Sequence, residues 1–430
     1  MSTHRSGIAG ATRHVLANGM VALIQRNPTT PTVSVRGELR IGAVHEPASQ
    51  SGLAVFTGAA LIRGAGERSY QQIVAETEAR GCSVNAGGGL HSSGFGAKAL
   101  TEDLPLVIEI LADMLARPTF PAHEVEKLRA QFLLGLRESE QETGTQASRA
   151  ARELLYPPEH PYSRLSSGSV ATVQDLGRDD LLRFHEGYHP AGGAVAVVGD
   201  VEPAAVIELL EQYLGGWARP GEPPALDLAP VPPLETIRRR DIPMAGKVQS
   251  DLIWAVHGLR RSDPDFYAAM LANMILGRLG LGGRLGENVR EKQGMAYYCY
   301  SGLEADVGTG PWSAVAGVNP ANVERAIAAV LHEVAQFVAE GPTEQELADA
   351  RSYLTGSMVL GLETNDGIAG TLLAIERYGL GLDFVERYPA IIEGVSREQI
   401  VETARRYLTT DRYVLAVAGP PASGGEGTGA

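Results

Sequence analysis

Two residues in the second half of the chain, Arg290 and Tyr297, have side chains that could act together on one carbonyl group. They flank Gly294, and a glycine there is typical of a helix end from which the chain reverses into a strand. A guanidinium group and a tyrosine hydroxyl can both donate hydrogen bonds to the same oxygen. The alternative is an ordinary surface arginine in a charged helix and a tyrosine packed in a sheet.

A second candidate is the stretch from His185 to His189, which matches the pattern His-Glu-x-x-His of one class of zinc site. Two histidines in this pattern need a full helical turn between them to share one face. Gly187 interrupts the stretch and Pro190 follows it, so the helix is expected to end at or before His189. We interpret both histidines as residues at a helix C-terminus, where the helix dipole is negative. A zinc hydrolase that uses them is the alternative.

Composition excludes several kinds of protein. The chain has 430 residues, and its net charge of −14 argues against a nucleic-acid surface or a polybasic membrane patch. Two cysteines, Cys82 and Cys299, do not make a disulfide framework. There is no apolar N-terminal segment typical of a signal peptide and no apolar run of membrane-spanning length. We expect a cytoplasmic protein without membrane association.

A proline-rich stretch divides the chain almost in half. Six of the 25 prolines lie between Pro220 and Pro233, a density that blocks helices and central strands alike. We predict an N-terminal domain over residues 1–219, a linker over 220–234 and a C-terminal domain over 235–420. Residues 421–430, which are mostly Gly, Ser and Ala, are expected to form a disordered tail.

The two halves are predicted to be copies of one domain. A helix-spaced apolar stripe recurs 219 residues later, and so do a tyrosine and an apolar strand; the paired stripes are Leu104, Ile108, Leu111, Leu115 and Val323, Ile327, Val330, Val334. Strands and helices do not alternate strictly. The fold class is therefore predicted to be α+β, with a mainly antiparallel sheet and helices on one face in each half. The two halves are expected to face each other as a clamshell.

Several ordered motifs make the chain similar to the insulinase/pitrilysin family of zinc peptidases, which includes the mitochondrial processing peptidase and bacterial relatives. The resemblance extends from about Val15 to Gly419 and is strongest at residues 283–297. The other motifs lie at Gly42–Pro47, Ser51–Ala54, Gly81–Ala86, Leu115–Phe120 and Val198–Asp200.

The zinc motif of the family is missing from this sequence. Catalytic members carry His-x-x-Glu-His after the equivalent of Gly52-Leu53-Ala54, with two histidines as zinc ligands and the glutamate as general base. Here Val55 and Ala59 stand at the histidine positions, and Gly58 stands at the glutamate position. The family's third ligand falls at Gly135 or Leu136, although Glu138 and Glu140 lie nearby. We therefore predict no metal and no cofactor on this chain.

The resemblance implies a role for the residues that remain. In the family an arginine and a tyrosine of the second half bind the substrate carbonyl beside the bond that is cut, so Arg290 and Tyr297 are the predicted catalytic residues. Asn85 and Ala86 are predicted to lie on a sheet edge that binds the substrate as an added strand. Arg284 is predicted to support the pair or contact the substrate.

The preferred interpretation is a non-catalytic, substrate-binding subunit of a heterodimeric zinc metallopeptidase that hydrolyses unfolded peptides. A zinc-binding partner subunit of the same family would supply the metal, and the chain alone would be inactive. The isolated chain could form a homodimer. The alternative is a structural subunit similar to the core proteins of respiratory complexes.

Overall fold

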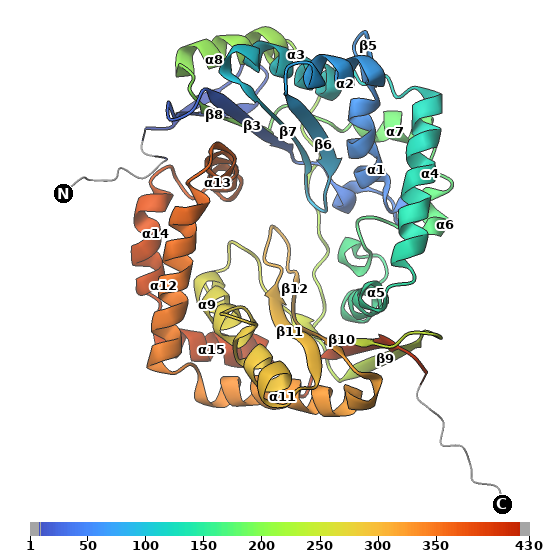
Figure 1. The fold of residues 1–430 in the computed structure, drawn as a ribbon, viewed down its shortest axis with the longest axis vertical. Helices are drawn as coiled ribbons and strands as arrows, with labels where there is room; N and C mark the ends of the chain where they lie inside the picture. The colour runs from blue at the N-terminus through green and yellow to red at the C-terminus, as the bar shows by residue number, and fades with distance from the viewer. Residues whose placement is uncertain (1–7, 9, 422–430) are drawn as a thin grey trace, which may run out of the picture. The chain divides into compact units, whose positions relative to one another are not determined.

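The structure, a computed structural model, describes residue 8 and residues 10–421, so the predicted tail lies almost entirely outside the described residues. The chain forms two units that exchange segments (Figure 1). Unit 1 consists of Met1–Leu136, Leu165–Asp227 and Ser357–Arg387. Unit 2 consists of Arg137–Arg164, Leu228–Gly356 and Tyr388–Ala430. Each unit therefore takes one segment from the opposite half of the sequence.

Unit 1 is built on a six-stranded sheet with the order β1-β2-β8-β3-β7-β6. All neighbouring strands are antiparallel except β2 and β8, which confirms the predicted mainly antiparallel sheet. The strands are β1 (Thr12–Val15), β2 (Val21–Arg26), β3 (Thr32–Leu39), β6 (Ser83–Gly88), β7 (Ser93–Leu100) and β8 (Ala194–Gly199); β4 (Gly64–Ala65) and β5 (Arg68–Ser69) pair separately.

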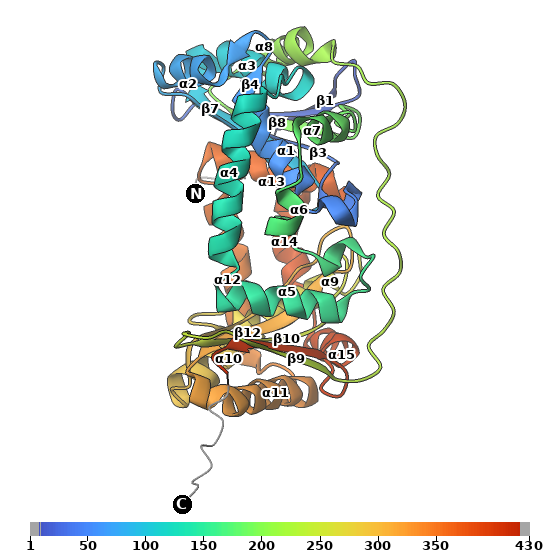
Figure 2. The same ribbon diagram turned by 90° about the vertical axis from the view of Figure 1, so that its right-hand side faces the viewer.

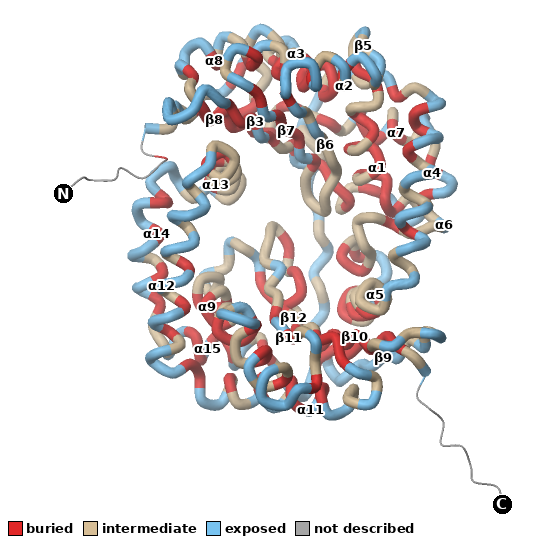
Figure 3. The backbone as a smooth tube through the Cα atoms, viewed as in Figure 1, coloured by how far each residue is buried: buried red, intermediate tan, exposed pale blue. Residues whose placement is uncertain are grey.

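The helices of unit 1 cover both faces of this sheet, although unequally. The alternating apolar residues of β3 and β7 join the main core, in which α1 and α3 also lie (Figure 3). The opposite face of β8 and β3 is covered by α13, which belongs to the second half of the chain (Figure 1). The helices are α1 (Leu53–Ala60), α2 (Tyr70–Glu78), α3 (Leu104–Ala116), α4 (Ala122–Ser139), α6 (Val170–Val173), α7 (Arg178–His185), α8 (Pro203–Leu210) and α13 (Asn365–Tyr378).

Unit 2 repeats the plan with five strands in the order β11-β12-β10-β13-β9, of which only the β13–β9 pair is parallel. Helix α5, from the first half of the chain, contacts β10 and β13 as α13 contacts β3 and β8. The strands are β9 (Arg238–Pro243), β10 (Ser250–His257), β11 (Ala296–Leu303), β12 (Pro311–Val318) and β13 (Val414–Gly419). The helices are α5 (Thr143–Leu155), α9 (Phe266–Gly277), α10 (Gly283–Leu285), η7 (Gly286–Lys292), α11 (Val323–Glu340), α12 (Glu344–Gly361), α14 (Phe384–Glu393) and α15 (Arg397–Tyr407).

The proline-rich stretch between the two halves contains no helix or strand from Pro220 to Leu234 and runs as a long extended segment (Figure 2). The repeat predicted from the sequence coincides with α3 and α11, which begin 219 residues apart at Leu104 and Val323. In the part of the chain that the structure describes, no helix has the length and apolar character needed to cross a membrane.

Candidate functional site

Arg290 and Tyr297 lie on either side of a glycine-dependent helix end, as the sequence predicts. Arg290 belongs to η7, a short π-helix, and Tyr297 is the second residue of β11. The N–H of Gly294 donates to the carbonyl of Arg290 at 3.0 Å, and the N–H of Met295 donates to that of Val289 at 3.1 Å. Gly294 has a φ of +61°, which only glycine adopts without strain, so this residue makes the reversal possible.

A β-bulge presents Tyr297 to solvent. Ala296 pairs with Val318 and Tyr298 pairs with Gly317, which leaves Tyr297 as the extra, unpaired residue of β11. Its side chain is 62 % exposed. Arg290 is also accessible, and its Nε lies 3.5 Å from a carboxylate oxygen of Glu291. Both donors therefore remain available to a ligand.

The residue after the bulge is fixed in place. The hydroxyl of Tyr298 donates to the carboxylate of Asp251, a buried residue of β10. Asp251 also accepts hydrogen bonds from Thr143, the first residue of α5, and from Gln249 at 3.2 Å. Burial and the bond to Asp251 raise the pKa of Tyr298. This network joins α5, β10 and β11 directly beneath the bulge.

Arg284 has the contacts of an anchor. Its Nε and Nη2 donate to the two carboxylate oxygens of Glu346, each at 2.6 Å, and Nη2 also donates to the carbonyl of Gly341 at 3.0 Å. Only 14 % of its side chain is exposed. The guanidinium ties α10 to α12, so these contacts support a positioning role; the predicted substrate contact of Arg284 stays a prediction.

The helix that carries the zinc motif in catalytic relatives is closed against the sheet edge in this chain. Gly58, at the position of the general base, packs directly on β6: a Cβ atom there would lie 2.2 Å from the nitrogen of Gly88. The contact is reciprocal, because a Cβ atom at Gly88 would lie 2.0 Å from the carbonyl oxygen of Ala54. Real Cβ atoms do not approach other atoms so closely, so α1 and β6 meet backbone to backbone.

The residues at the other ligand positions do not fit a metal either. Val55 and Ala59 offer no donor atoms. Gly135 is exposed, and Leu136 is buried in the core of unit 1. Among the described residues, no group of three or more His, Cys, Asp or Glu side chains is placed to hold an ion. The side chains at this position are therefore incompatible with the zinc site of the family.

The histidines of the His-Glu-x-x-His stretch are engaged elsewhere. Helix α7 ends at His185, whose Nε2 bonds the carbonyl of Leu115 at 2.8 Å and whose Nδ1 faces Arg219 at 3.1 Å. His189 lies beyond the helix, with Nε2 3.0 Å from the carbonyl oxygen of Gly221. Burial lowers the pKa of His185 to about 4. Both imidazoles bond backbone groups and α7 ends at His185, which argues against the alternative of a zinc hydrolase that uses them.

The strand β6, which carries Asn85 and Ala86, is the last strand of its sheet. Asn85 is exposed, whereas the side chain of Ala86 packs against the core of unit 1. Only the backbone of Ala86 could therefore contact an added peptide strand. Their role in substrate binding stays a prediction.

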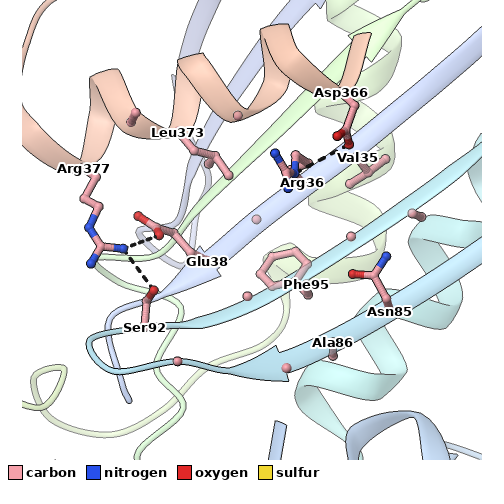
Figure 4. Close-up of a pocket in the computed structure, with 18 of the residues that line it drawn as sticks. Val35, Arg36, Glu38, Asn85, Ala86, Ser92, Phe95, Asp366, Leu373 and Arg377 are labelled. Carbon is pink, nitrogen blue, oxygen red and sulfur yellow. Dashed lines mark hydrogen bonds and ion pairs between the residues drawn. The ribbon is translucent and has the colours of Figure 1, made fainter. Parts of the chain in front are cut away.

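A groove of about 780 Å³ lies beside this edge, between the open face of β7 and β6 and the helix α13 (Figure 4). Its walls carry two sets of charges. Arg377 of α13 donates to Glu38 of β3 at 2.8 Å, and Arg36 of β3 lies 3.6 Å from Asp366 of α13. Asn85 of β6 also lines the groove (Figure 4).

Sequence reasoning missed the residues of this groove. The alternation of β3 places Ser34, Arg36 and Glu38 on its polar face, which a local pattern assigns to solvent. In the structure α13 covers that face, and its partners lie more than 330 positions away in the sequence. One signal was available in the sequence: the helix that carries Asp366 and Arg377 has charges opposite to those of Arg36 and Glu38 on β3.

The repeated α+β units, with an α1 helix at the place of a zinc motif, define a peptidase-like protein. Comparison with known proteins agrees: residues 21–156 match the profile of the insulinase family (peptidase family M16), and residues 175–354 match that of the peptidase M16 inactive domain. The chain belongs to the peptidase M16 family.

Relatives match along nearly the full chain. An uncharacterized zinc protease of Streptomyces coelicolor is 26 % identical over 423 residues, which cover 96 % of this chain and 90 % of the relative. The mitochondrial-processing peptidase subunit beta of Saccharomyces cerevisiae is 23 % identical over 381 residues, 86 % of this chain and 82 % of the relative. The crystal structure of a peptidase M16 inactive domain from Pseudomonas fluorescens superposes with a TM-score of 0.86 at 26 % identity and covers 96 % of this chain and 98 % of that one.

Proposed function

We propose that this chain is the non-catalytic, substrate-binding subunit of a heterodimeric zinc metallopeptidase. The observation that carries the proposal is a contrast between the two units. In unit 1, Gly58 packs on the backbone of β6 where a catalytic member has its general base. In unit 2, Arg290 at the helix end and Tyr297 at the β-bulge remain accessible to solvent. A chain that had lost all peptidase function would have no need to present them.

In the proposed assembly a partner of the same family supplies zinc and the general base, and this chain supplies the two donors. Attack on a peptide carbonyl places negative charge on its oxygen. The guanidinium of Arg290 and the hydroxyl of Tyr297 donate hydrogen bonds to that oxygen and stabilise the charge. The chain alone would be inactive because the residues at the zinc-motif positions, Val55, Gly58 and Ala59, can neither bind zinc nor accept a proton from water. A relative named as the beta subunit of a processing peptidase supports a two-subunit arrangement.

The test is co-expression with a relative that carries an intact His-x-x-Glu-His motif, followed by a peptide-cleavage assay. We expect cleavage only in the mixture, with a fall of about 10²-fold or more in kcat for Arg290→Ala and for Tyr297→Phe. Two matched variants serve as controls: Arg278→Ala removes an exposed arginine near the same helix, and Tyr300→Phe removes a hydroxyl on the same strand. Both should cleave at the wild-type rate.

Two results would reject the proposal. If the mixture cleaves peptides equally well when both Arg290 and Tyr297 are changed, the pair takes no part in the reaction. If the two chains associate but no peptide is cleaved, the chain has the scaffold role instead. We further propose that the protein is cytoplasmic and that its substrates are unfolded peptides, which fits exposed strand edges in both units.

A further inference from the structure

The floor of the groove in unit 1 is nearly bare of side chains. On β7 the residues that alternate toward the groove include Gly94 and Gly96, and on β6 they include Gly87. A Cβ atom at Gly87 would meet nothing within 4 Å, and one at Gly94 would meet only the carbonyl oxygen of Gly37 at 3.9 Å. The space above Gly87 and Gly94 is therefore open, and the groove's volume of about 780 Å³ is that of a ligand site.

The wall of the groove carries an excess of positive charge at one end. One carboxylate oxygen of Asp366 accepts a hydrogen bond from the hydroxyl of Ser34 at 3.2 Å. The same oxygen lies 3.6 Å from the guanidinium of Arg36 and 3.8 Å from the ammonium of Lys98. Two cations thus share one carboxylate. By contrast, Glu38 and Arg377 neutralise each other at the far end of the wall. A ligand carboxylate beside Arg36 and Lys98 would complete the charge balance.

The edge of the sheet that borders the groove can receive an extended chain. β6 pairs with β7 along its whole length, and no other backbone hydrogen bond of the described chain involves Ser83–Gly88. From Ser83 to Gly87, every second N–H and C=O group of β6 therefore points outward without a backbone partner, whereas at Gly88 the strand packs against α1. A peptide strand added here would lie next to β6, at the border of the glycine floor, and direct alternate side chains into the groove.

In unit 2 the corresponding face of the sheet is covered by side chains of the chain itself. In unit 2 the open face beside α5 carries the rings of Tyr298 and Tyr300 on the outermost strand, and the remaining cavity measures about 330 Å³. In unit 1 the corresponding face beside α13 carries glycines, and the cavity is more than twice as large. The space left in unit 1 suits an aromatic side chain supplied from outside.

We propose that the unit 1 groove is a non-hydrolysing binding site for an extended peptide with a large aromatic side chain and, two residues away on the same face of the strand, an acidic one. The aromatic side chain lies on the floor at Gly87 and Gly94, and the acidic side chain pairs with Arg36 and Lys98. This inference rests on the proposed role of the chain as a peptide-binding subunit. It adds a second holding point for the substrate, made entirely by residues of unit 1.

The test uses the isolated full chain and fluorescence anisotropy. The probe is a short fluorescein-labelled peptide of glycine, serine and threonine with one phenylalanine and one glutamate two positions away, so that both side chains lie on one face of the strand. Replacing its phenylalanine by alanine should weaken binding by roughly tenfold or more, because the ring is buried on the floor. Replacing its glutamate by lysine should weaken binding a few-fold, and this effect should vanish at high salt.

Variants of the chain locate the site. Gly94→Val and Gly87→Val place side chains in open space at residues with ordinary backbone angles, so each should fold and lower the affinity for the aromatic peptide to that of the alanine peptide. Lys98→Gln should remove the preference for glutamate. Gly302→Val, a matched change on the outer strand of unit 2, should leave affinity unchanged. Melting temperatures of all variants exclude misfolding.

Equal affinity for the phenylalanine and alanine peptides would overturn the inference, as would undiminished binding by both valine variants on the floor. Self-association that disappears in Gly94→Val, with no peptide binding, would mean that a second copy occupies the groove and would also overturn it. The proposed function is tested separately. If the chain binds the phenylalanine and alanine peptides equally while cleavage in the mixture still depends on Arg290, only this inference is refuted. If the chain prefers the phenylalanine peptide but cleavage does not depend on Arg290 and Tyr297, only the proposed function is refuted.

Discussion

Rebuilding the zinc motif by Val55→His, Gly58→Glu and Ala59→His should destabilise this protein without giving it a metal site. Any side chain at position 58 starts 2.2 Å from the backbone of Gly88, so α1 must move away from β6 by roughly 1 Å. Overpacking of this kind costs roughly 1–3 kcal/mol. A buried carboxylate without a donor adds a similar cost. The total is a large part of the roughly 5–15 kcal/mol by which domains are stable.

The assay combines urea unfolding with metal analysis of the purified variant. Gly58→Ala isolates the steric part and should lower the free energy of unfolding by about 1–3 kcal/mol. Gly135→Ala is the matched control, because it adds the same methyl group to a helix glycine with nothing within 4 Å. That change should raise stability by about 0.5–1 kcal/mol, since alanine favours helix.

The reasoning would be refuted by a triple variant that unfolds at the wild-type urea concentration and retains one zinc per chain. Such a result would mean that α1 can move away from β6 without lowering the free energy of unfolding, and that the zinc site lacks only its ligand side chains. Wild-type stability of Gly58→Ala would by itself remove the steric argument. Destabilisation without zinc is the outcome that supports the closed helix.

Three further predictions concern the supports of the fold. Because burial lowers the pKa of His185 from 6.5 to about 4, the unfolded chain binds a proton first as the pH falls, so stability is complete above pH 6.5 and declines toward pH 4. Comparing urea unfolding of wild type and His185→Gln at pH 7 and pH 4.5 should show that the wild type loses roughly 2 kcal/mol more. Glu346→Gln should cost about 1–3 kcal/mol in the same assay because Arg284 loses its charged partner, and an unchanged midpoint would contradict the anchor role. Asp251→Asn should cost about 1–2 kcal/mol because an amide offers one acceptor oxygen to donors such as Tyr298, and undiminished stability would show that the network contributes nothing.

The elements that positioned Arg290 and Tyr297 could be predicted because their causes are local. Gly294 permits a left-handed backbone, so the helix end and the following strand could be placed from the sequence. The repeat was equally visible, since an offset of 219 residues aligns α3 with α11. The bulge at Tyr297 was not predicted, because it depends on the register between β11 and β12 and no residue type specifies it.

The state of the zinc-motif helix required the structure. The sequence showed that Gly58 lacks a carboxylate, but a missing ligand leaves either an empty site or a filled one. The same offset places Gly58 opposite Gly277 of α9, where a Cβ atom would lie 2.1 Å from the nitrogen of Ser301 on β11. Unit 1 therefore has the same close helix-to-strand packing as unit 2 has at Gly277, a residue within the stretch 175–354 that matches the peptidase M16 inactive domain. Loss of the catalytic side chain and closure of the helix occur together.

The exchange of α5 and α13 limits what local patterns can predict. Helix α5 has a buried apolar stripe formed by Ala147, Ala151 and Leu155. Such a stripe indicates that one face of the helix is buried, but it does not indicate which sheet the helix packs against, because the hydrophobic effect is not directional. The ion pair between Glu38 and Arg377 spans 339 positions, so β3 acquires a partner that its own alternation cannot indicate. The walls of the unit 1 groove thus come from both halves of the chain. The charges that line it follow from the exchange, which is a property of the folded molecule.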